Sequence, residues 1–307
     1  MSSPVSKSEF VRLLTSQIKV VGEDKYKNLP KMRDKLYKVV NTDSAWEEYY
    51  DVGSLPDVPS FNGKLEYLGI SPGFHTKIEN KTYALGVQVE RELIDDKKYP
   101  VLMNMAEKLM VSAHRTQAKI EARPFQNAFS AAFDYMTSEE GVALCSSSHS
   151  TKSGTSTTTG FDNAGTSALS KTSIAATRLA MRLFRNDISE RIEIGDDLCI
   201  ICPDALADQA YEVTNTMKQV DSANNNVNME FGRYKVIPYL RLDDTDANNW
   251  FMCWESHMKE SLIWQERVAP EINTTWDFET YLNKFSVYFR CANGWIDWRW
   301  IYGHNVS

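Results

Sequence analysis

The sequence lacks the features that would place it in a membrane or outside the cell. It contains no apolar run long enough to cross a bilayer, and no apolar core of a secretory signal lies near its start. Its five cysteines are an odd number, whereas a secreted disulfide framework needs paired thiols. These absences predict a protein that is made in a reducing cytosol and has no membrane partner.

Signature motifs of common enzyme classes are also missing. The chain has no phosphate-binding glycine loop, no dinucleotide-binding glycine pattern and no HExxH helix. Its five histidines are scattered, without a pair four residues apart or an acidic partner at ligand spacing. The sequence therefore predicts no catalytic residues, no metal site and no cofactor.

One candidate for catalysis is His149. Cys145, or a serine of the SSSHS run, could act as a nucleophile beside it. A nucleophile needs a base that a third group holds on a rigid frame. These residues open a Ser/Thr/Gly-rich segment, 145–166, whose composition predicts a flexible surface loop. A cysteine or serine hydrolase is therefore only a minor hypothesis.

Cys199 and Cys202 form a CxxC pair, a spacing that can indicate a zinc or redox site. The pair lies in the apolar run LCIICPD, with no second cysteine pair nearby. Free cysteine behaves as a small apolar side chain. We expect both thiols to be buried in a strand, without metal or redox chemistry.

The composition is that of an ordinary folded protein with one uneven charge distribution. Of the 307 residues, 42% are hydrophobic and 24% are charged, and the length suits about two domains. The net charge of −7 argues against nucleic-acid binding by the chain as a whole. The first forty residues, however, carry nine Lys/Arg and four Asp/Glu. This basic segment could contact an acidic neighbour or DNA, or it could be a solvated helix face.

A long amphipathic helix after residues 90–93 is the clearest predicted element. Asp95 and Asp96 suit the positive end of a helix dipole, and Pro100 is tolerated in a first turn. Pro124 marks the end of the helix or a kink. About 25 residues give a rod of roughly 35–40 Å. Its apolar stripe is Val101, Leu102, Met105, Ala106, Leu109, Ala113, Thr116 and Ile120.

Two extended runs precede this helix. Residues 64–70 and 83–93 flank a segment at 71–82 that is polar and rich in turn-forming residues. The pattern predicts a long β-hairpin with a polar tip, preceded by a proline-marked linker at 53–61. A two-stranded hairpin is marginal in water, so we expect this one to lie across a partner.

The two ends of the chain give further predictions. Residues 1–50 look helical, and we expect Gly22 to end the first helix. Near the C-terminus, Asn293-Gly294 stands between two alternating runs, which is the strongest short signal of a hairpin turn. We expect the tryptophan-rich strand at 295–302 to cover the long helix. Between the ends, the pattern predicts helices at 172–185 and from 203, with strands at 197–202, 233–240, 250–254 and 262–268.

Four segments within residues 52–218 carry a resemblance to a known family, and their order and spacing along the chain make the resemblance specific. They are KIENKTYALGVQVERELIDDKKY (77–99), EGVALCSSSH (140–149), SALSKTSIAATRLAMRLFRN (167–186) and DLCIICPDALADQAYEV (197–213). With these segments the chain resembles the major capsid proteins of tailed phages with the Hong Kong 97-type fold, most closely the Mu-like major head subunit branch.

The resemblance implies an α+β capsid fold with five parts. They are an N-terminal arm (1–52), an extended β-hairpin loop (53–96), a peripheral domain with a long spine helix (97–138), an axial domain (139–275) and the terminal strands of the peripheral domain (276–307). It also implies a structural protein, not an enzyme, that self-assembles into hexamers and pentamers of an icosahedral shell around double-stranded DNA. The place of action would be the virion capsid, assembled in the host cytoplasm.

Partners follow from the same resemblance. We expect other copies of the chain, a portal, DNA contacted without sequence preference and, as a further option, a decoration protein. Because the sequence begins at Met1, we expect no cleaved scaffolding segment and hence a separate scaffolding protein. An encapsulin-like compartment with the same fold is the alternative function.

Some family members crosslink a loop lysine to a neighbouring subunit's asparagine. Lys77 and Lys81 lie in the corresponding loop, but we expect them to be solvated or salt-bridged and predict no crosslink. The candidate assembly contacts are Phe74, Lys77, Lys81, Glu90, Arg91, His114 and Arg115.

Overall fold

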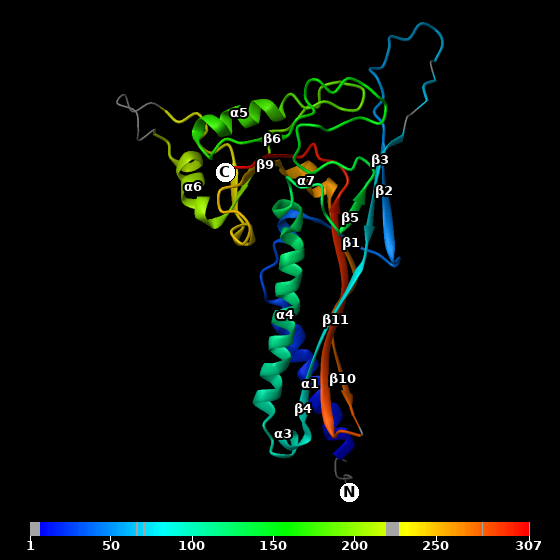
Figure 1. The fold of residues 1–307 in the computed structure, drawn as a ribbon, viewed down its shortest axis with the longest axis vertical. Helices are drawn as coiled ribbons and strands as arrows, with labels where there is room; N and C mark the ends of the chain where they lie inside the picture. Colours follow the sequence, from blue (N-terminus) through cyan, green and yellow to red (C-terminus); the bar gives the residue numbers. More distant parts are fainter. Residues whose placement is uncertain (1–6, 66, 70–71, 219–226, 278, 307) are drawn as a thin grey trace.

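The computed structural model describes residues 7–65, 67–69, 72–218, 227–277 and 279–306. An elongated limb built from α1, α4, β4, β10 and β11 extends from a broader part that contains α5, α6 and β9 (Figure 1). In chain order the elements are α1 (Lys7–Lys27), α2 (Arg33–Leu36), β1 (Lys38–Asn41), β2 (Trp46–Val52), β3 (Pro72–Glu79), β4 (Lys81–Glu90), α3 (Arg91–Asp95), α4 (Tyr99–Gln126), β5 (Met136–Ser138), β6 (Ala164–Gly165), α5 (Lys171–Met181), β7 (Leu198–Cys202), η1 (Asp204–Leu206), α6 (Ala207–Asn215), β8 (Lys235–Pro238), η2 (Leu240–Leu242), β9 (Trp250–Trp254), α7 (Glu255–Ser261), β10 (Leu262–Trp276), β11 (Leu282–Trp295) and β12 (Ile301–His304).

The predicted long helix is α4, and it forms the spine of the limb. Pro100 lies in its first turn and Pro124 lies in its last turn, as the sequence predicts. The buried stripe includes Leu102, Ala106 and Ile120, whereas Val101 is exposed, so the buried face is rotated slightly from the predicted one. Against this face pack α1 and the strands of a four-stranded sheet in the order β1-β10-β11-β4.

The predicted C-terminal hairpin is wrong, because Asn293 and Gly294 do not form a turn. Both lie inside β11, paired in register with Trp264 and Ile263 of β10, and the chain reverses between β10 and β11 instead. A Cβ on Gly294 would lie 2.8 Å from Cδ1 of Ile78, so glycine allows β3 to approach this strand closely.

The tryptophan-rich segment covers much less of α4 than predicted. Its contact with the helix is made by Trp300, whose ring lies edge-on to Phe125 at 6.0 Å between centroids, near the helix C-terminus. The rest of the stripe is covered by α1, β10 and β11. The sequence identified the apolar stripe of α4 and the apolar segment at 295–302 correctly, but the prediction that this segment covers most of the stripe is wrong.

A second, five-stranded sheet of order β6-β12-β9-β7-β8 forms the core of the broader part, with α5 and α6 packed beside it. The predicted strands at 197–202 and 250–254 are confirmed as β7 and β9. Cys199 and Cys202 are fully buried in β7, and all five cysteines are buried and free, as predicted for strand cysteines.

The predicted hairpin before the long helix is also wrong. Residues 64, 65 and 67–69 form no strand, while residues 66, 70 and 71 lie outside the described residues. The segment expected to be a polar tip is β3, which pairs with β2 and β5. The run at 83–93 contributes to β4, but β4 pairs with β11, far away in the sequence. The true hairpin is therefore β2–β3, with residues 53–71 as its connection.

The first helix does not end at Gly22 but continues to Lys27. A Cβ at this position would lie 2.3 Å from Cδ1 of Ile272 and 3.3 Å from Cγ of Met110. Glycine is thus required by the close packing of α1 on β10 and α4. The sequence shows the helix-weakening residue but not the neighbours that require it.

Candidate assembly interface

The connection between β2 and β3 carries a row of exposed apolar side chains. It contains no helix or strand over residues 53–65 and 67–69, and it projects away from the body (Figure 1). Val58 and Tyr67 are 95% and 90% exposed. The other large apolar side chains exposed in this stretch are Val52, Leu55, Phe61, Leu65 and Leu68. Single exposed apolar residues are ordinary, but a row of them indicates a surface that another molecule covers.

The root of this projecting segment is held firmly. His75 of β3 stacks on Tyr50 of β2, with 5.7 Å between ring centroids, and its Nδ1 lies 2.8 Å from Oε2 of Glu139. Lys152 donates to the same carboxylate over 2.6 Å. The bond from Lys152, joined by those from His75, lowers the pKa of Glu139 to about 2. The root is therefore tied to Glu139 and Lys152 by charge-assisted hydrogen bonds.

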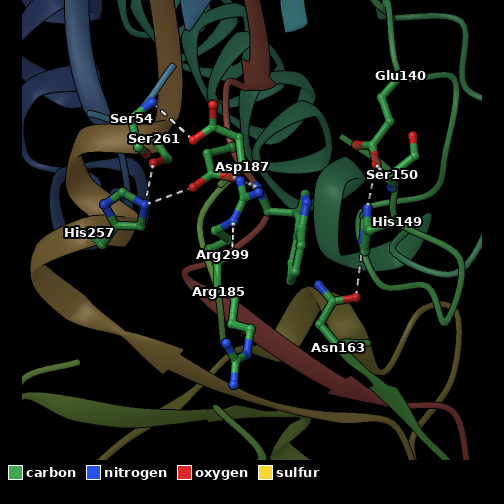
Figure 2. Close-up of polar contacts among 12 residues, drawn as sticks. Ser54, Glu140, His149, Ser150, Asn163, Arg185, Asp187, His257, Ser261 and Arg299 are labelled. Carbon is green, nitrogen blue, oxygen red and sulfur yellow. Dashed lines mark hydrogen bonds and ion pairs between the residues drawn. The ribbon is translucent and has the colours of Figure 1, made fainter. Parts of the chain in front are cut away.

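A second tie joins the start of the projecting segment to the loop after α5. The backbone N–H of Ser54 donates to Oδ1 of Asp187 over 2.9 Å, as Figure 2 shows. The hydroxyl of Ser153 donates to the backbone carbonyl of Asp187 over 2.7 Å. These bonds fix where the projecting segment leaves the body, while the apolar row itself is uncovered.

A buried charge cluster lies beside this junction. The carboxylate of Asp297 faces Nε2 of His257 at 3.0 Å and accepts from Arg299 over 2.7 Å. Burial opposes ionisation of Asp297, but Arg299 and His257 outweigh it and hold the pKa of Asp297 well below its usual range. Burial likewise opposes the charge on His257, yet Asp297 raises the pKa of that imidazole. Burial, with repulsion from Asp297, raises the pKa of nearby Asp51.

The cavity at this junction is too small for a substrate. Its volume is about 30 Å³, and Asp51, Phe74, Asp187 and Arg299 are among the residues that line it. Pockets for small molecules usually measure several hundred cubic ångströms, whereas this one holds about two waters. Among the described residues, no group of three or more His, Cys, Asp or Glu is arranged to hold a metal ion.

His149 is a fixed structural residue, so the predicted flexible loop is wrong at this position. Its Nδ1 lies 3.0 Å from Oε1 of Glu140, and its Nε2 lies 3.1 Å from Oδ1 of Asn163 (Figure 2). The ring stacks on Trp298 at 4.1 Å between centroids. Cys145 is buried, and burial raises the pKa of its thiol well above the usual value. No cysteine or serine side chain is a hydrogen-bond partner of His149 within the described part of the chain.

Three of the predicted contact residues lie near the root of the projecting segment. Lys77 pairs with Glu79 at 2.7 Å and lies over the Trp46 ring at 4.8 Å, and Lys81 pairs with Asp134 at 3.3 Å. Both lysines are thus salt-bridged, as expected, within their own chain. Phe74 is half-buried and lines the junction cavity.

The other four predicted contact residues lie on the limb. Glu90 and Arg91 are exposed where β4 meets α3, and Arg91 pairs with Asp95 at 3.3 Å. His114 of α4 bonds through Nε2 to the backbone carbonyl of Pro30 over 2.8 Å, which holds the segment after α1 against the helix. Arg115 is exposed. The structure therefore places the seven residues at the root of the projecting segment, at the junction of β4 with α3 and in the middle of α4, and not at one site.

The strongest candidate interface residues, those of the apolar row, were missed by the sequence prediction. The signal was present in the sequence. Leu55, Val58, Phe61, Leu65 and Leu68 recur every three or four positions. The first three lie in the segment predicted only as a linker, 53–61, and the last two in the run predicted as a strand, 64–70. A linker without function would have less reason to carry such residues.

No described helix is long and apolar enough to span a membrane. No curated protein sequence matches the chain. The sequence model of the phage capsid protein family matches residues 76–303, from β3 through β12. This match includes strands of both sheets, all except β1, which lies before residue 76.

Among the solved structures that resemble the chain are three capsids. The mature capsid of bacteriophage PhiM1 has a TM-score of 0.56 and 10% identity, covering 91% of this chain and 88% of that one. The capsid of the native GTA particle has a TM-score of 0.53 and 11% identity, covering 91% of both chains. The capsid of cyanophage P-SCSP1u has a TM-score of 0.53 and 12% identity, covering 91% of this chain and 88% of that one.

At these identities the structural likeness establishes the fold, which is the Hong Kong 97-type capsid fold predicted from the sequence. The assignment to the Mu-like branch stays a prediction. The sequence model spans well over half of the chain, and on this ground the chain belongs to the phage capsid protein family.

Proposed function

We propose that this capsid protein assembles with copies of itself into the hexamers and pentamers of an icosahedral shell that encloses double-stranded DNA. The observation that carries the proposal is the apolar row at 52–68, rooted on β2–β3 and uncovered by its own chain. Burying one large apolar side chain contributes about 1.5–3 kcal/mol. Several such side chains per copy, repeated around a closed shell, supply a strong drive to assemble.

The strand pairing refines the proposed division of the chain. The arm at 1–52, the peripheral domain at 97–138 and the axial domain from 139 follow the family resemblance. Because β2 and β3 form the true hairpin, we assign the extended loop to 46–79 and not to 53–96. Because β10 and β11 form one hairpin beside α4, we assign 262–295 to the peripheral domain, without a boundary at 275.

The proposed partners are other copies of the chain, packaged DNA, a portal and a separate scaffolding protein, with assembly in the host cytoplasm. A decoration protein would bind the finished shell. Membership of the phage capsid protein family favours a DNA-filled virion over an encapsulin-like compartment. The contents of native particles distinguish the two, since a compartment would hold a packaged enzyme and no DNA.

The test is assembly of the purified protein, followed by electron microscopy. The wild type should form capsomers or closed shells. The triple variant Val58→Ser/Phe61→Ser/Tyr67→Ser should keep the wild-type circular dichroism spectrum but remain unassembled, because these exposed side chains support no fold contact.

The matched control changes three exposed polar residues of the same segment, Asp57→Asn/Ser60→Asn/Asn62→Ser, and should assemble normally. Shells formed by the Val58/Phe61/Tyr67 triple variant as readily as by the wild type would disprove the role of the apolar row. A wild type that stays monomeric under all assembly conditions would count against the capsid proposal itself.

A further inference from the structure

The exposed face of α4 carries only positive charge. The exposed residues of this helix are Pro100, Val101, Asn104, Lys108, Val111, Arg115 and Lys119. Both carboxylates of the helix lie elsewhere, since Glu121 is buried and Glu107 is half-buried. The strands β4, β10 and β11 lie on the other side of α4 (Figure 1). The helix therefore presents a row of three cations, and Glu107, its partly exposed carboxylate, is paired with Lys25.

These three cations have no ion-pair partner in their own chain. Among the described side chains, no carboxylate lies within 4.0 Å of the charged nitrogens of Lys108, Arg115 or Lys119. The nearby Glu107 is instead engaged by Lys25 of α1 at 3.7 Å. Other cations of the chain, such as Lys77, Lys81 and Arg182, are paired with carboxylates. The face of α4 is thus left with uncompensated charge.

A second positive segment adjoins this face. Lys27 and Lys35 are exposed on either side of the turn that joins α1 to α2. That turn is fixed beside α4, because the carbonyl of Pro30 bonds to His114, the residue next to Arg115. Residues 16–38 and 99–126 together carry eleven Lys/Arg and five Asp/Glu, whereas the whole chain carries 34 and 41. Positive charge is therefore concentrated here in an acidic protein.

We propose that this cationic face, formed by Lys27, Lys35, Lys108, Arg115 and Lys119, binds the phosphate backbone of double-stranded DNA. The proposal rests on the proposed function, which supplies the DNA, and it deepens that function by naming the surface that touches the packaged polymer. It also decides between the alternatives that the basic N-terminal segment leaves open.

Charge and shape favour DNA over a protein partner. A protein interface usually has aromatic or aliphatic anchors at its centre. On this helix the exposed apolar side chains are Val101 and Val111, at 43% and 38% exposure. Surfaces that bind DNA backbone are instead polar and strongly positive. A helix face that bears cations and few apolar side chains suits contact with phosphates.

The spacing of the cations also fits a duplex. At 1.5 Å per residue, Lys108 to Lys119 spans about 16 Å of helix. Double-stranded DNA carries one negative charge per roughly 1.7 Å of its axis, so the face runs beside about ten phosphates. Backbone contacts carry no sequence information. Binding should therefore be independent of sequence and sensitive to salt.

The experiment measures binding of the purified, unassembled protein to a fluorescent 30-base-pair duplex of mixed sequence across a series of salt concentrations. The test variant is Lys108→Gln/Arg115→Gln/Lys119→Gln, which keeps good helix formers at exposed positions. We expect at least a tenfold loss of affinity, and a slope of log K against log salt that is shallower by about 2–3, as loss of three phosphate contacts predicts.

The matched control removes three exposed cations elsewhere, Lys64→Gln/Arg191→Gln/Lys218→Gln, and should bind DNA like the wild type. An α4 triple variant that keeps wild-type affinity and salt slope would overturn the proposal. Displacement of the duplex by poly-L-glutamate as effectively as by unlabelled duplex, at equal charge concentration, would show an acidic polypeptide to be the partner and would also overturn it.

Shell assembly is scored in parallel by electron microscopy, so that the two proposals fail separately. The double variant Lys108→Gln/Lys119→Gln, which leaves the predicted assembly contact Arg115 in place, should form shells as the wild type does, since its changes lie outside the apolar row. Shells from both proteins, with DNA affinity unchanged by the substitutions, would reject the DNA surface and leave the capsid function standing. A wild type without shells would reject the capsid function.

Discussion

The side-chain amide of Asn293, in β11, donates a hydrogen bond to the backbone carbonyl of Ile120, in α4, over 2.7 Å. In a regular helix this carbonyl accepts from the N–H four residues later. That residue is Pro124, which has no N–H. Asn293 therefore supplies the donor that the proline removes, and it ties the sheet to the spine helix where the helix is weakest.

We predict that Asn293→Leu lowers the free energy of unfolding by about 2–3 kcal/mol, because it leaves a buried carbonyl without a donor. In a Pro124→Ala background, the backbone N–H of residue 124 can bond Ile120, so the same substitution should cost less. Urea unfolding of the four proteins in a double-mutant cycle measures the difference. Asn283→Leu, at a half-buried site in the same strand, is the control. Equal costs in both backgrounds would contradict the proposed compensation.

The same residue shows why the terminal hairpin could not be predicted from the sequence. Asn-Gly between alternating runs is a strong local signal for a turn. Here, however, both residues are required by contacts with residues that are distant in the sequence. Asn293 donates a hydrogen bond to Ile120, 173 residues earlier in the sequence. Gly294 makes room for Ile78, more than 200 residues earlier. Local sequence cannot distinguish a glycine that forms a turn from a glycine that allows another strand to pack closely against it.

Elements governed by local pattern were predicted well. The spine helix, with its proline in the first turn, and the buried strands β7 and β9 follow from periodicity and apolar runs. Which strands pair with each other could not be predicted from local pattern in this way. Alternation identified β4 as a strand, but its partner β11 lies about 200 residues later. The apolar row was missed for a related reason, since its partner lies outside the chain.

We predict that Gly22→Ala destabilises the docking of α1 by about 1–2 kcal/mol, since the added methyl overpacks a filled site. The first atom it meets is Cδ1 of Ile272, at 2.3 Å. Ile272→Val removes that atom, so the double variant should recover part of the loss. Thermal unfolding of the two single variants and the double variant tests this. A double variant whose losses simply add would show that Ile272 is not the obstacle.

The contribution of Glu121 to stability should fall as pH rises through the range in which this carboxyl titrates. Burial raises the pKa of this carboxyl from 4.5 to about 7, although Arg33 acts in the opposite direction. Between these values the folded state holds a proton that the unfolded state has lost, so the free energy of unfolding decreases with increasing pH. The decrease is complete above pH 7 and amounts to about 3 kcal/mol at 1.36 kcal/mol per pKa unit.

Urea unfolding at pH 5 and pH 8 tests this assignment. Between the two values the wild type should lose about 2.5 kcal/mol more stability than Glu121→Gln, which cannot ionise, because the opposing titration of His304, whose pKa burial lowers to about 4, is common to both proteins. Glu107→Gln on the same helix removes a carboxylate at a half-buried site and should retain the wild-type decline. A decline in Glu121→Gln as steep as in the wild type would assign the effect to other groups.

Finally, His149 should matter for stability and not for catalysis. His149→Ala removes the partner of the buried Glu140 carboxylate and the ring stacked on Trp298. Breaking such a buried pair costs about 3 kcal/mol, which thermal unfolding should register as a clear fall in Tm. His75→Ala, at a more exposed ring that also faces a carboxylate, should cost under about 1 kcal/mol. With activated ester substrates, wild type and variant should both show only the background rate of hydrolysis. Wild-type ester hydrolysis that disappears in His149→Ala would restore the hydrolase hypothesis, because the histidine would then be acting as a base toward a nucleophile.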